Sequence, residues 1–221
     1  MSRLLTINPL IPEPAVIQQA VAVLQQGGVV AYLTDTVYGL AVDARQPEAI
    51  ARLYTLKERP AIKALPVLIG ALAQLDTLVA TVPDAAARLL AAFWPGPLTL
   101  VMQPHASVPK PLLGSSAGLG VRWSAAALGQ QLALGLGGAI TATSANRSGC
   151  PEALSAGEVW SQLAPAVDLV LDAGPAASPV VSTVLDVTVT PPCLLRSGRV
   201  SRQALEAVLG APVQQKTVDT C

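Results

Sequence analysis

Short apolar runs alternate with helix-like segments along most of the chain, and this alternation constrains the fold more than any other feature. Val29–Leu33, Leu65–Ile69 and Leu98–Met102 have the length and composition of buried strands. Pro14–Gln26 and Pro47–Leu56 carry apolar residues at helical spacing and begin with proline, which suits a first helical turn. Strands that alternate with helices predict an α/β fold. Because no repeat or linker divides the 221 residues, we expect one domain with a mixed, mostly buried sheet.

The rest of the chain continues this pattern. Further helices are predicted at Ala71–Val79, from Pro83 to just before Trp94, at Ala125–Leu134, at Gly157–Leu163, and from a cap at Ser201 to Leu209. Further strands are predicted at Leu119–Trp123, Ala139–Thr143, Val167–Leu171 and Val180–Val187, and Leu194–Leu195 leads into the last polar segment. The domain is expected to span residues 1–213, with a frayed tail from Gln214 to Cys221. Polar segments follow several strand ends, where open α/β sheets place their ligand crevice.

Composition excludes several classes of function. Lys and Arg number 14, as do Asp and Glu, so the zero net charge does not support a general nucleic-acid or membrane-surface binder. The cysteines are Cys150, Cys193 and Cys221, far apart and without a CxxC pair, which argues against a disulfide framework or zinc site and favours a reducing compartment. No secretory leader or transmembrane span is apparent, so we expect a soluble, cytoplasmic protein without membrane contact.

A single histidine, His105, narrows the chemistry further. A Ser-His-Asp hydrolase or a His-rich metal site would have to use this one loop residue, and we expect it to be an ordinary surface residue. Chemistry should therefore run on Lys, Arg, Ser, Thr, Asn and carboxylates.

Three cations, Lys57, Arg59 and Lys63, fall within seven residues of a chain that is only 13% charged, against about 25% in an average domain. Pro60 biases Arg59 toward an extended backbone, in which residues two apart point to the same side. Lys57 and Arg59 could then reach one polyanion together, such as a nucleotide triphosphate. The alternative interpretation is a solvated helix end, whose dipole favours cations.

Other polar segments have both structural and functional interpretations. Thr34–Thr36 could be a tight turn whose side chains bond their own backbone, and Thr141–Asn146 could be a cap and loop. Arg122 lies on an apolar strand and cannot be buried without an anion, and Arg196 poses the same problem.

Taken in order, these segments resemble a known family. TDTVYGL, KERPAIK, WPGPLTLV, GVRW, TSANRSG, STVLDVT and LLRSG together resemble the YrdC-type L-threonylcarbamoyladenylate synthases, from about Ile7 to Leu209. The resemblance implies a single α/β domain, with a twisted mixed sheet flanked by helices around an open, positively charged cavity. It also implies a nucleotidyltransferase that condenses L-threonine, bicarbonate and ATP to threonylcarbamoyl-AMP and pyrophosphate. The product would serve threonylcarbamoyl-adenosine modification of tRNA through a separate transfer complex, with direct tRNA contact possible. The chain is similar in length to the short, single-domain bacterial form.

The resemblance also implies roles for individual residues. Lys57 and Arg59 would be catalytic, and the ATP-binding set would be Lys57, Arg59, Lys63, Ser144, Asn146 and Arg196. The threonine-binding set would be Thr36, Arg122, Ala142 and Ser182, with Arg122 clamping the carboxylate as a planar match. Mg²⁺ should be held by the phosphates and water, with no metal ligands from the protein.

The chain departs from the family pattern at Leu33, Ala64, Trp123-Ser124, Val181 and Ser197. None of these positions removes a proposed ligand side chain, so they bear on loop shape and affinity more than on the reaction.

Two alternatives remain beside the synthase. One is a non-catalytic module that binds tRNA or double-stranded RNA on the same fold, which zero net charge and 3% aromatics disfavour. The other is a carbamoyl-transfer domain of the kind found in multidomain proteins, whose partner modules we do not see here. A related paralogue type weakens the KxR and SxN segments, and this chain keeps both.

Overall fold

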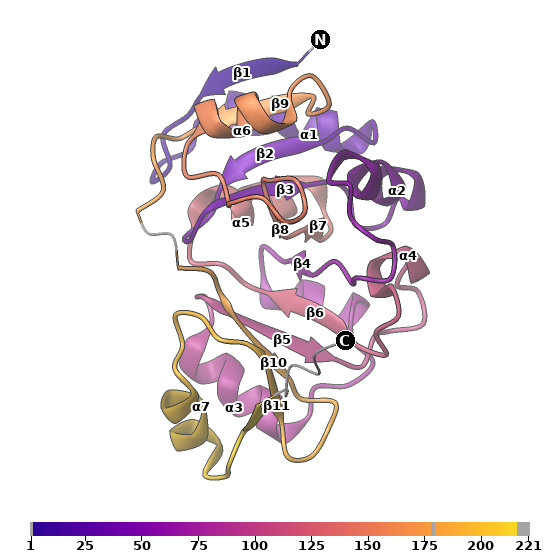
Figure 1. Ribbon diagram of the computed structural model, residues 1–221, viewed down its shortest axis with the longest axis vertical. Coiled ribbons are helices and arrows are strands. Elements are labelled where there is room, and N and C mark those ends of the chain that lie inside the picture. Colours follow the sequence, from indigo (N-terminus) through magenta and orange to yellow (C-terminus); the bar gives the residue numbers. More distant parts are fainter. Residues whose placement is uncertain (1, 178–179, 216–221) are drawn as a thin grey trace.

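The computed structural model describes residues 2–177 and 180–215 and contains two mixed β-sheets arranged along the long axis of the molecule (Figure 1). The five-stranded sheet runs in the order β1 (Arg3–Thr6), β9 (Leu169–Asp172), β2 (Val30–Leu33), β3 (Tyr38–Ala41), β8 (Thr143–Ser144). The seven-stranded sheet runs in the order β12 (Gln214–Gln215), β11 (Cys193–Arg196), β10 (Thr183–Asp186), β5 (Leu98–Met102), β6 (Leu119–Arg122), β4 (Val67–Leu68), β7 (Ile140–Thr141).

The predicted α/β domain is confirmed, but its strands form two sheets where we expected one. The predicted strand Ala139–Thr143 is split, because β7 pairs with β4 in one sheet and β8 pairs with β3 in the other. Between them, the Ala142 amide donates to the Pro66 carbonyl at 2.8 Å. Ala142 therefore lies where the chain passes from one sheet to the other.

The helices agree closely with the sequence pattern. They are α1 (Pro14–Gln25), α2 (Pro47–Leu56), α3 (Asp84–Phe93), α4 (Lys110–Leu113), α5 (Ala127–Leu136), α6 (Ala156–Leu163) and α7 (Arg202–Leu209). Ser201 caps α7 as predicted, since its hydroxyl accepts from the Ala204 amide at 3.1 Å. The predicted helix Ala71–Val79 is a 3₁₀ helix, Leu72–Thr77.

Five short elements were not predicted as helix or strand: β1, β3, α4, β11 and β12. All four residues of β3 are buried, so it lacks the polar-apolar alternation that reveals a half-exposed strand. β12 corrects the predicted frayed tail, because Gln214 and Gln215 pair with β11. Residues 216–221 of that predicted tail lie outside the described residues.

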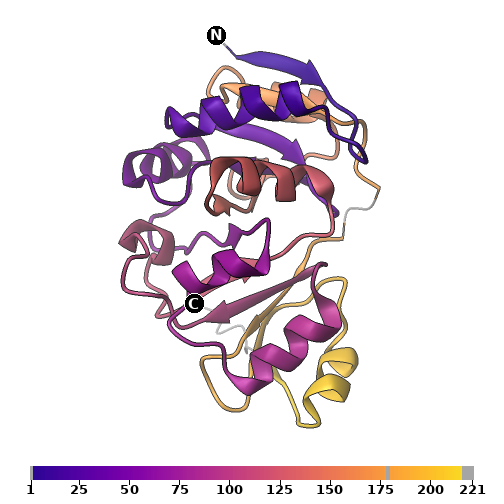
Figure 2. The same ribbon diagram turned by 180° about the vertical axis from the view of Figure 1, so that it is seen from behind.

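Helices cover both faces of the five-stranded sheet (Figures 1 and 2). Val30 and Tyr32 of β2 pack in one apolar cluster with α1 and α5, while Val29 and Ala31 pack with α6 in a second cluster. This assignment follows from the pleat, which turns successive side chains to opposite faces.

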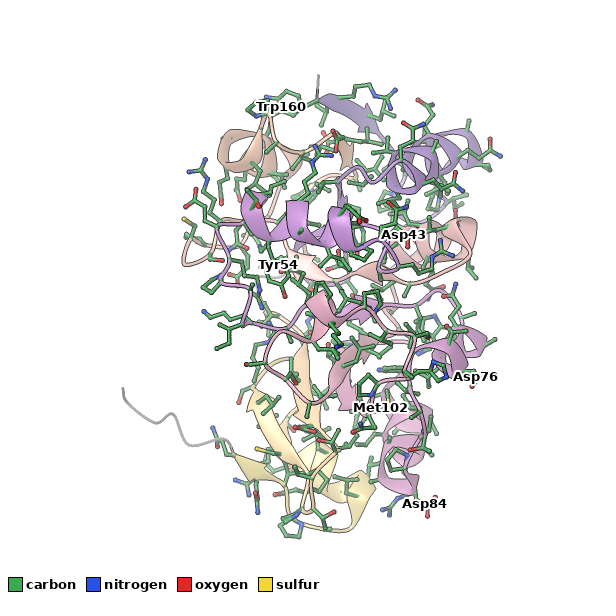
Figure 3. All side chains as sticks on the ribbon, turned by 90° about the vertical axis from the view of Figure 1, so that its right-hand side faces the viewer. Asp43, Tyr54, Asp76, Asp84, Met102 and Trp160 are labelled. Carbon is green, nitrogen blue, oxygen red and sulfur yellow. The ribbon has the colours of Figure 1, made fainter. Side chains whose placement is uncertain are left out.

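Side chains pack along the whole length of the molecule, from Trp160 on α6 at one end to Asp84 on α3 at the other (Figure 3). Helices α3 and α7 lie together against the seven-stranded sheet (Figure 1). Within residues 2–177 and 180–215, no helix combines the length and apolarity that a membrane span requires.

Candidate functional site

A cavity of about 570 Å³ lies between the two sheets and is lined by residues from both. Seven of the ten residues predicted for the site line it: Thr36, Arg59, Arg122, Ala142, Ser144, Ser182 and Arg196. The three that do not line it are Lys57, Lys63 and Asn146. The structure therefore brings the two predicted binding sets to one cavity, although their members are spread over most of the chain.

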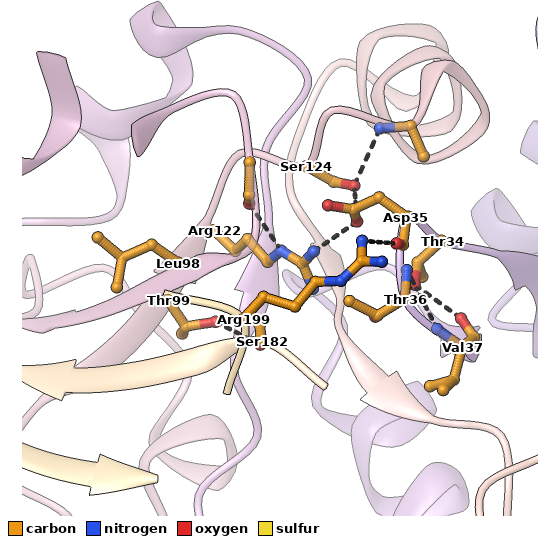
Figure 4. Close-up of polar contacts among 12 residues, drawn as sticks. Thr34, Asp35, Thr36, Val37, Leu98, Thr99, Arg122, Ser124, Ser182 and Arg199 are labelled. Atoms are coloured by element: carbon orange, nitrogen blue, oxygen red, sulfur yellow. Dashed lines mark hydrogen bonds and ion pairs between the residues drawn. The ribbon is translucent and has the colours of Figure 1, made fainter. Parts of the chain in front are cut away.

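Arg122 at the end of β6 is 6% exposed and pairs with Asp35 on the turn between β2 and β3. Its Nη2 donates to the Asp35 carboxylate, and its Nε donates to the Gly96 carbonyl at 3.1 Å (Figure 4). Ser124 donates its hydroxyl to the same Asp35 oxygen at 2.5 Å. The anion that a buried Arg122 requires is thus supplied by the chain itself.

This pairing changes what Arg122 can offer a ligand. Nη1 has no hydrogen-bond partner among the described residues, whereas Nε and Nη2 both have one. A carboxylate ligand would meet Nη1 first, rather than the free planar fork that the sequence predicted.

The turn Thr34–Thr36 is organised by its first hydroxyl. Thr34 Oγ1 accepts from the Thr36 amide at 3.0 Å and the Val37 amide at 3.2 Å, and donates to the Val37 carbonyl at 2.7 Å (Figure 4). The threonine therefore satisfies local backbone as a turn residue should. The Asp35 carboxylate does not, because it points to Arg122, and its backbone carbonyl accepts from Arg199 Nη1 at 3.0 Å.

Arg196 on β11 lines the cavity and holds Ser182 in place. Its Nε donates to the Ser182 carbonyl at 3.0 Å, and its Nη2 donates to the Ser182 hydroxyl at 2.9 Å. Gly198 allows this approach, since a Cβ there would meet the backbone of Ser182 and Thr183 at 2.5 Å. Partial desolvation, together with the fields of Arg122 and Arg59, lowers the pKa of Arg196.

Arg59 follows helix α2 and is one of the residues that line the cavity. Its Nη2 donates to the Ala64 carbonyl at 2.8 Å, and burial lowers its pKa. No carboxylate in the described chain lies within ion-pair distance of Arg59. The charged residues of the cavity lining are three arginines and Asp186.

Lys57 and Arg59 diverge, which corrects the predicted extended stretch. Lys57 keeps a helical backbone at φ −83°, and Glu58 adopts a left-handed conformation at φ 51°. The chain therefore turns at Glu58, so Lys57 points into the protein and Arg59 points toward the cavity. Non-glycine residues with this backbone are strained and cluster at functional sites.

Lys57 is 2% exposed and ties the KxR segment to the SxN segment. Its ammonium donates to the Ser144 carbonyl at 2.5 Å and to the Asn146 carbonyl at 2.6 Å, with the Asn146 amide oxygen at 3.2 Å. Ser144 in turn donates its hydroxyl to the Asn146 amide oxygen at 2.6 Å. Direct contact of Lys57 and Asn146 with ATP stays a prediction. In this structure Lys57 binds the Ser144 carbonyl and Asn146 accepts from the Ser144 hydroxyl, so both hold Ser144 in place.

Burial, and next the field of Arg59, lower the pKa of Lys57 from 10.5 to about 8. Below pH 8 both folded and unfolded states hold the proton, so the cost of the buried ammonium is fully present. Between pH 8 and 10.5 the unfolded state binds more protons, and stability should rise with pH by up to about 3 kcal/mol. This rise should be absent from Lys57→Met, measured as the free energy of unfolding in denaturant across that range.

Lys57→Met also loses the hydrogen bonds of the ammonium, which changes the free energy of unfolding by the same amount at every pH. The slope of stability against pH is therefore the quantity that tests the prediction. The matched control is Lys110→Met, which removes an exposed lysine and should keep the wild-type slope. Equal slopes in wild type and Lys57→Met would contradict the buried, desolvated ammonium.

Asp35 and Ser124 are site residues that the sequence analysis missed. Asp35 was considered only as part of a turn, and Ser124 only as a departure from the family pattern. The available signal was the unpaired Arg122 on an apolar strand, which required an anion but did not identify it.

Lys63 is exposed on a turn closed by its amide donating to the Pro60 carbonyl at 3.0 Å. His105 is exposed, as predicted, and its Nδ1 lies 2.7 Å from the Ser107 hydroxyl. Cys150 and Cys193 are free thiols, and Cys221 lies outside the described residues. Over the described ranges, no group of three or more His, Cys, Asp or Glu could hold a metal ion.

Comparison with known proteins identifies the relatives of this fold. The Sua5/YciO/YrdC family model, described as "Telomere recombination", matches residues 22–198. A threonylcarbamoyl-AMP synthase of Pyrococcus abyssi is 36% identical over 209 residues, covering 92% of this chain and 62% of that protein. One from Bacillus subtilis is 37% identical over 196 residues, covering 88% and 56%. The crystal structure of P. abyssi Sua5 complexed with L-threonine superposes with a TM-score of 0.93 at 33% identity, covering 100% of this chain and 66% of that one. The chain thus spans less than two thirds of the length of these relatives.

Proposed function

The chain belongs to the Sua5/YciO/YrdC family, and from this premise we propose that it is an enzyme, an L-threonylcarbamoyladenylate synthase. It would condense L-threonine, bicarbonate and ATP to threonylcarbamoyl-AMP and pyrophosphate. The observation that carries the proposal is the cavity, where three arginines reach a space lined by hydroxyls from both sheets. Relatives named as this synthase, and a relative's complex with L-threonine, support it.

The reaction balances in two steps. The threonine amine and bicarbonate give the N-carboxylate and water, and a carboxylate oxygen then bonds to the α-phosphorus of ATP as the bond to pyrophosphate breaks. Charge moves onto phosphate oxygens, so positioned cations stabilise the transition state more than an acid-base pair would. Arg59, Lys63 and Arg196 would serve the triphosphate in this nucleotidyl transfer, making the cavity electropositive.

Ser144 would contact the nucleotide, because it lines the cavity and its backbone is anchored by Lys57. At the other end, Arg122 Nη1 would meet the threonine carboxylate, beside Thr36, Ala142 and Ser182. Mg²⁺ would arrive on the phosphates of ATP, which with water satisfy most of its octahedral shell.

The product would supply threonylcarbamoyl modification of tRNA through a separate transfer complex in the cytoplasm. Direct tRNA contact by this chain is not needed for the chemistry. The family relationship and the cavity residues favour the synthase over an RNA-binding module or a carbamoyl-transfer domain.

Purified protein is expected to release pyrophosphate from ATP only when both L-threonine and bicarbonate are present. The physical reason is that neither substrate alone supplies the carbamate nucleophile. A coupled pyrophosphate assay, with each substrate omitted in turn, checks this. Pyrophosphate release independent of threonine, or none from folded protein that binds ATP, would overturn the proposed reaction.

A further inference from the structure

One tyrosine among the residues that line the cavity has a buried hydroxyl without a hydrogen-bond partner in the described residues. Across the described part of the chain, three buried side-chain polar atoms have no hydrogen bond: Tyr32 Oη, Trp123 Nε1 and Gln162 Oε1. Of these residues only Tyr32 lines the cavity, and its side chain is fully buried. An unsatisfied buried hydroxyl costs about 1–3 kcal/mol, so its position calls for a ligand that pairs with it.

The Tyr32 ring has little room to move. A Cβ at Gly39, its partner across the β2–β3 ladder, would lie 3.4 Å from one ring edge. A Cβ at Gly129 on α5 would lie 3.1 Å from the other edge, so both glycines permit this close packing. The backbone at Gly39 and Gly129 therefore holds the Tyr32 ring from both edges and fixes the direction of its hydroxyl before a ligand binds.

The hydroxyl belongs to the amino-acid end of the cavity. The charges that act on the Tyr32 phenol are those of Arg122 and Asp35, and burial raises its pKa, which keeps it neutral. Arg122 already pairs with the Asp35 carboxylate. The neutral phenol of Tyr32 beside this pair is therefore suited to a hydrogen bond with a neutral polar group of a ligand, such as a hydroxyl.

The other hydroxyls expected to hold the amino acid already have partners inside the protein. Thr36 Oγ1 lies 2.9 Å from Thr34 Oγ1. Ser182 Oγ accepts from Arg196 at 2.9 Å and lies 3.2 Å from Thr99 Oγ1. Once the carboxylate is at Arg122 and the amine is carboxylated, the polar group of threonine still to be matched is its side-chain hydroxyl.

We propose that Tyr32 is a specificity-determining residue whose phenol hydroxyl hydrogen-bonds the side-chain hydroxyl of the amino-acid substrate. This inference rests on the proposed function, since it assumes an amino acid with its carboxylate at Arg122. A site built to pair a substrate hydroxyl rejects an isostere without it, because its own buried group is then left unpaired. Tyr32 thus separates L-threonine from L-valine.

Tyr32→Phe removes the hydroxyl and keeps the ring. We expect the Kd for L-threonine, measured by calorimetry, to rise roughly 10- to 100-fold while the weak Kd for L-valine stays unchanged or falls. The affinity of ATP should be unchanged. The variant should be at least as stable as wild type, because it loses only an unpaired buried group.

Tyr38→Phe is the matched control. Tyr38 is also buried in the cavity wall, but its hydroxyl donates to the Gly174 carbonyl at 2.7 Å and accepts from the Ala173 amide at 3.2 Å. This variant should lose stability and keep the wild-type ratio of threonine to valine affinity.

The outcomes separate the inference from the proposed function. Wild type that prefers threonine, with the same preference in Tyr32→Phe, overturns the role of Tyr32 alone. Wild type that binds threonine selectively but releases no pyrophosphate overturns the reaction, and Tyr32→Phe still tests the contact. Wild type that binds no threonine overturns both.

Discussion

Arg59→Ala is expected to lower kcat/KM for ATP by roughly 100-fold or more. Arg59 reaches the cavity with a desolvated guanidinium and, in the described chain, no carboxylate partner. The guanidinium is already partly desolvated in the folded protein, so its attraction to an anionic triphosphate is weakened less by water than that of a fully exposed arginine. Initial rates across an ATP series, with threonine and bicarbonate saturating, measure the effect.

Two further variants sharpen this result. Arg59→Lys keeps the charge but loses the planar donor set, and should fall between wild type and Arg59→Ala. Arg52→Ala is the control, because Arg52 lies on the preceding helix α2 and pairs with Asp168 at 2.8 Å, outside the cavity lining. Full activity in Arg59→Ala would refute the triphosphate assignment.

Arg122→Met is expected to raise the KM for threonine roughly 10- to 100-fold and to destabilise the fold by about 3–5 kcal/mol. Both effects follow from the Arg122–Asp35 pair, in which the two side chains are only 7% and 14% exposed. Removing the guanidinium leaves a largely buried carboxylate without its cation and also removes Nη1, the guanidinium nitrogen that has no partner among the described residues. Steady-state kinetics and denaturant unfolding measure the two effects separately.

The double variant Arg122→Met/Asp35→Asn distinguishes the effect on threonine binding from the effect on stability. It removes the unpaired charge, so stability should return most of the way toward wild type, while the KM for threonine should stay high. An amide at position 35 can still accept from Ser124, which limits other changes. A double variant that recovers both properties would show that Arg122 acts on threonine only through the stability of the turn at Asp35.

Much of the fold could be predicted because its signals are local. The predicted bounds of α2 match the structure, since Pro47 begins the helix and apolar residues recur at helical spacing. β3 could not be predicted, because a buried four-residue strand interrupted by Gly39 has no period to detect. The split at Ala142 was equally invisible, because partner choice between two sheets is not a local property.

The candidate site shows the same division. Residue types that suit polyanion binding could be recognised along the chain, and seven of the ten chosen residues line one cavity. Their chemical roles remain predictions. Lys57 was expected beside Arg59, and the left-handed backbone of Glu58 separates them. One interpretation had Asp35 bonding the backbone of its own turn, but its carboxylate pairs with Arg122, 87 residues away in sequence.

By itself, then, the sequence determined the class of fold, the extent of most helices and the segments that carry polar chemistry. These follow from periodicity, proline placement and residue type, which act over a few neighbouring positions. Only the tertiary structure decided that, among the described residues, Arg59 lines the cavity without a carboxylate partner, that Lys57 is buried and holds the Ser144 and Asn146 backbone, and that the buried Tyr32 hydroxyl has no partner. Hydrogen bonds and burial settle those questions, and they depend on residues that the chain brings together from far apart.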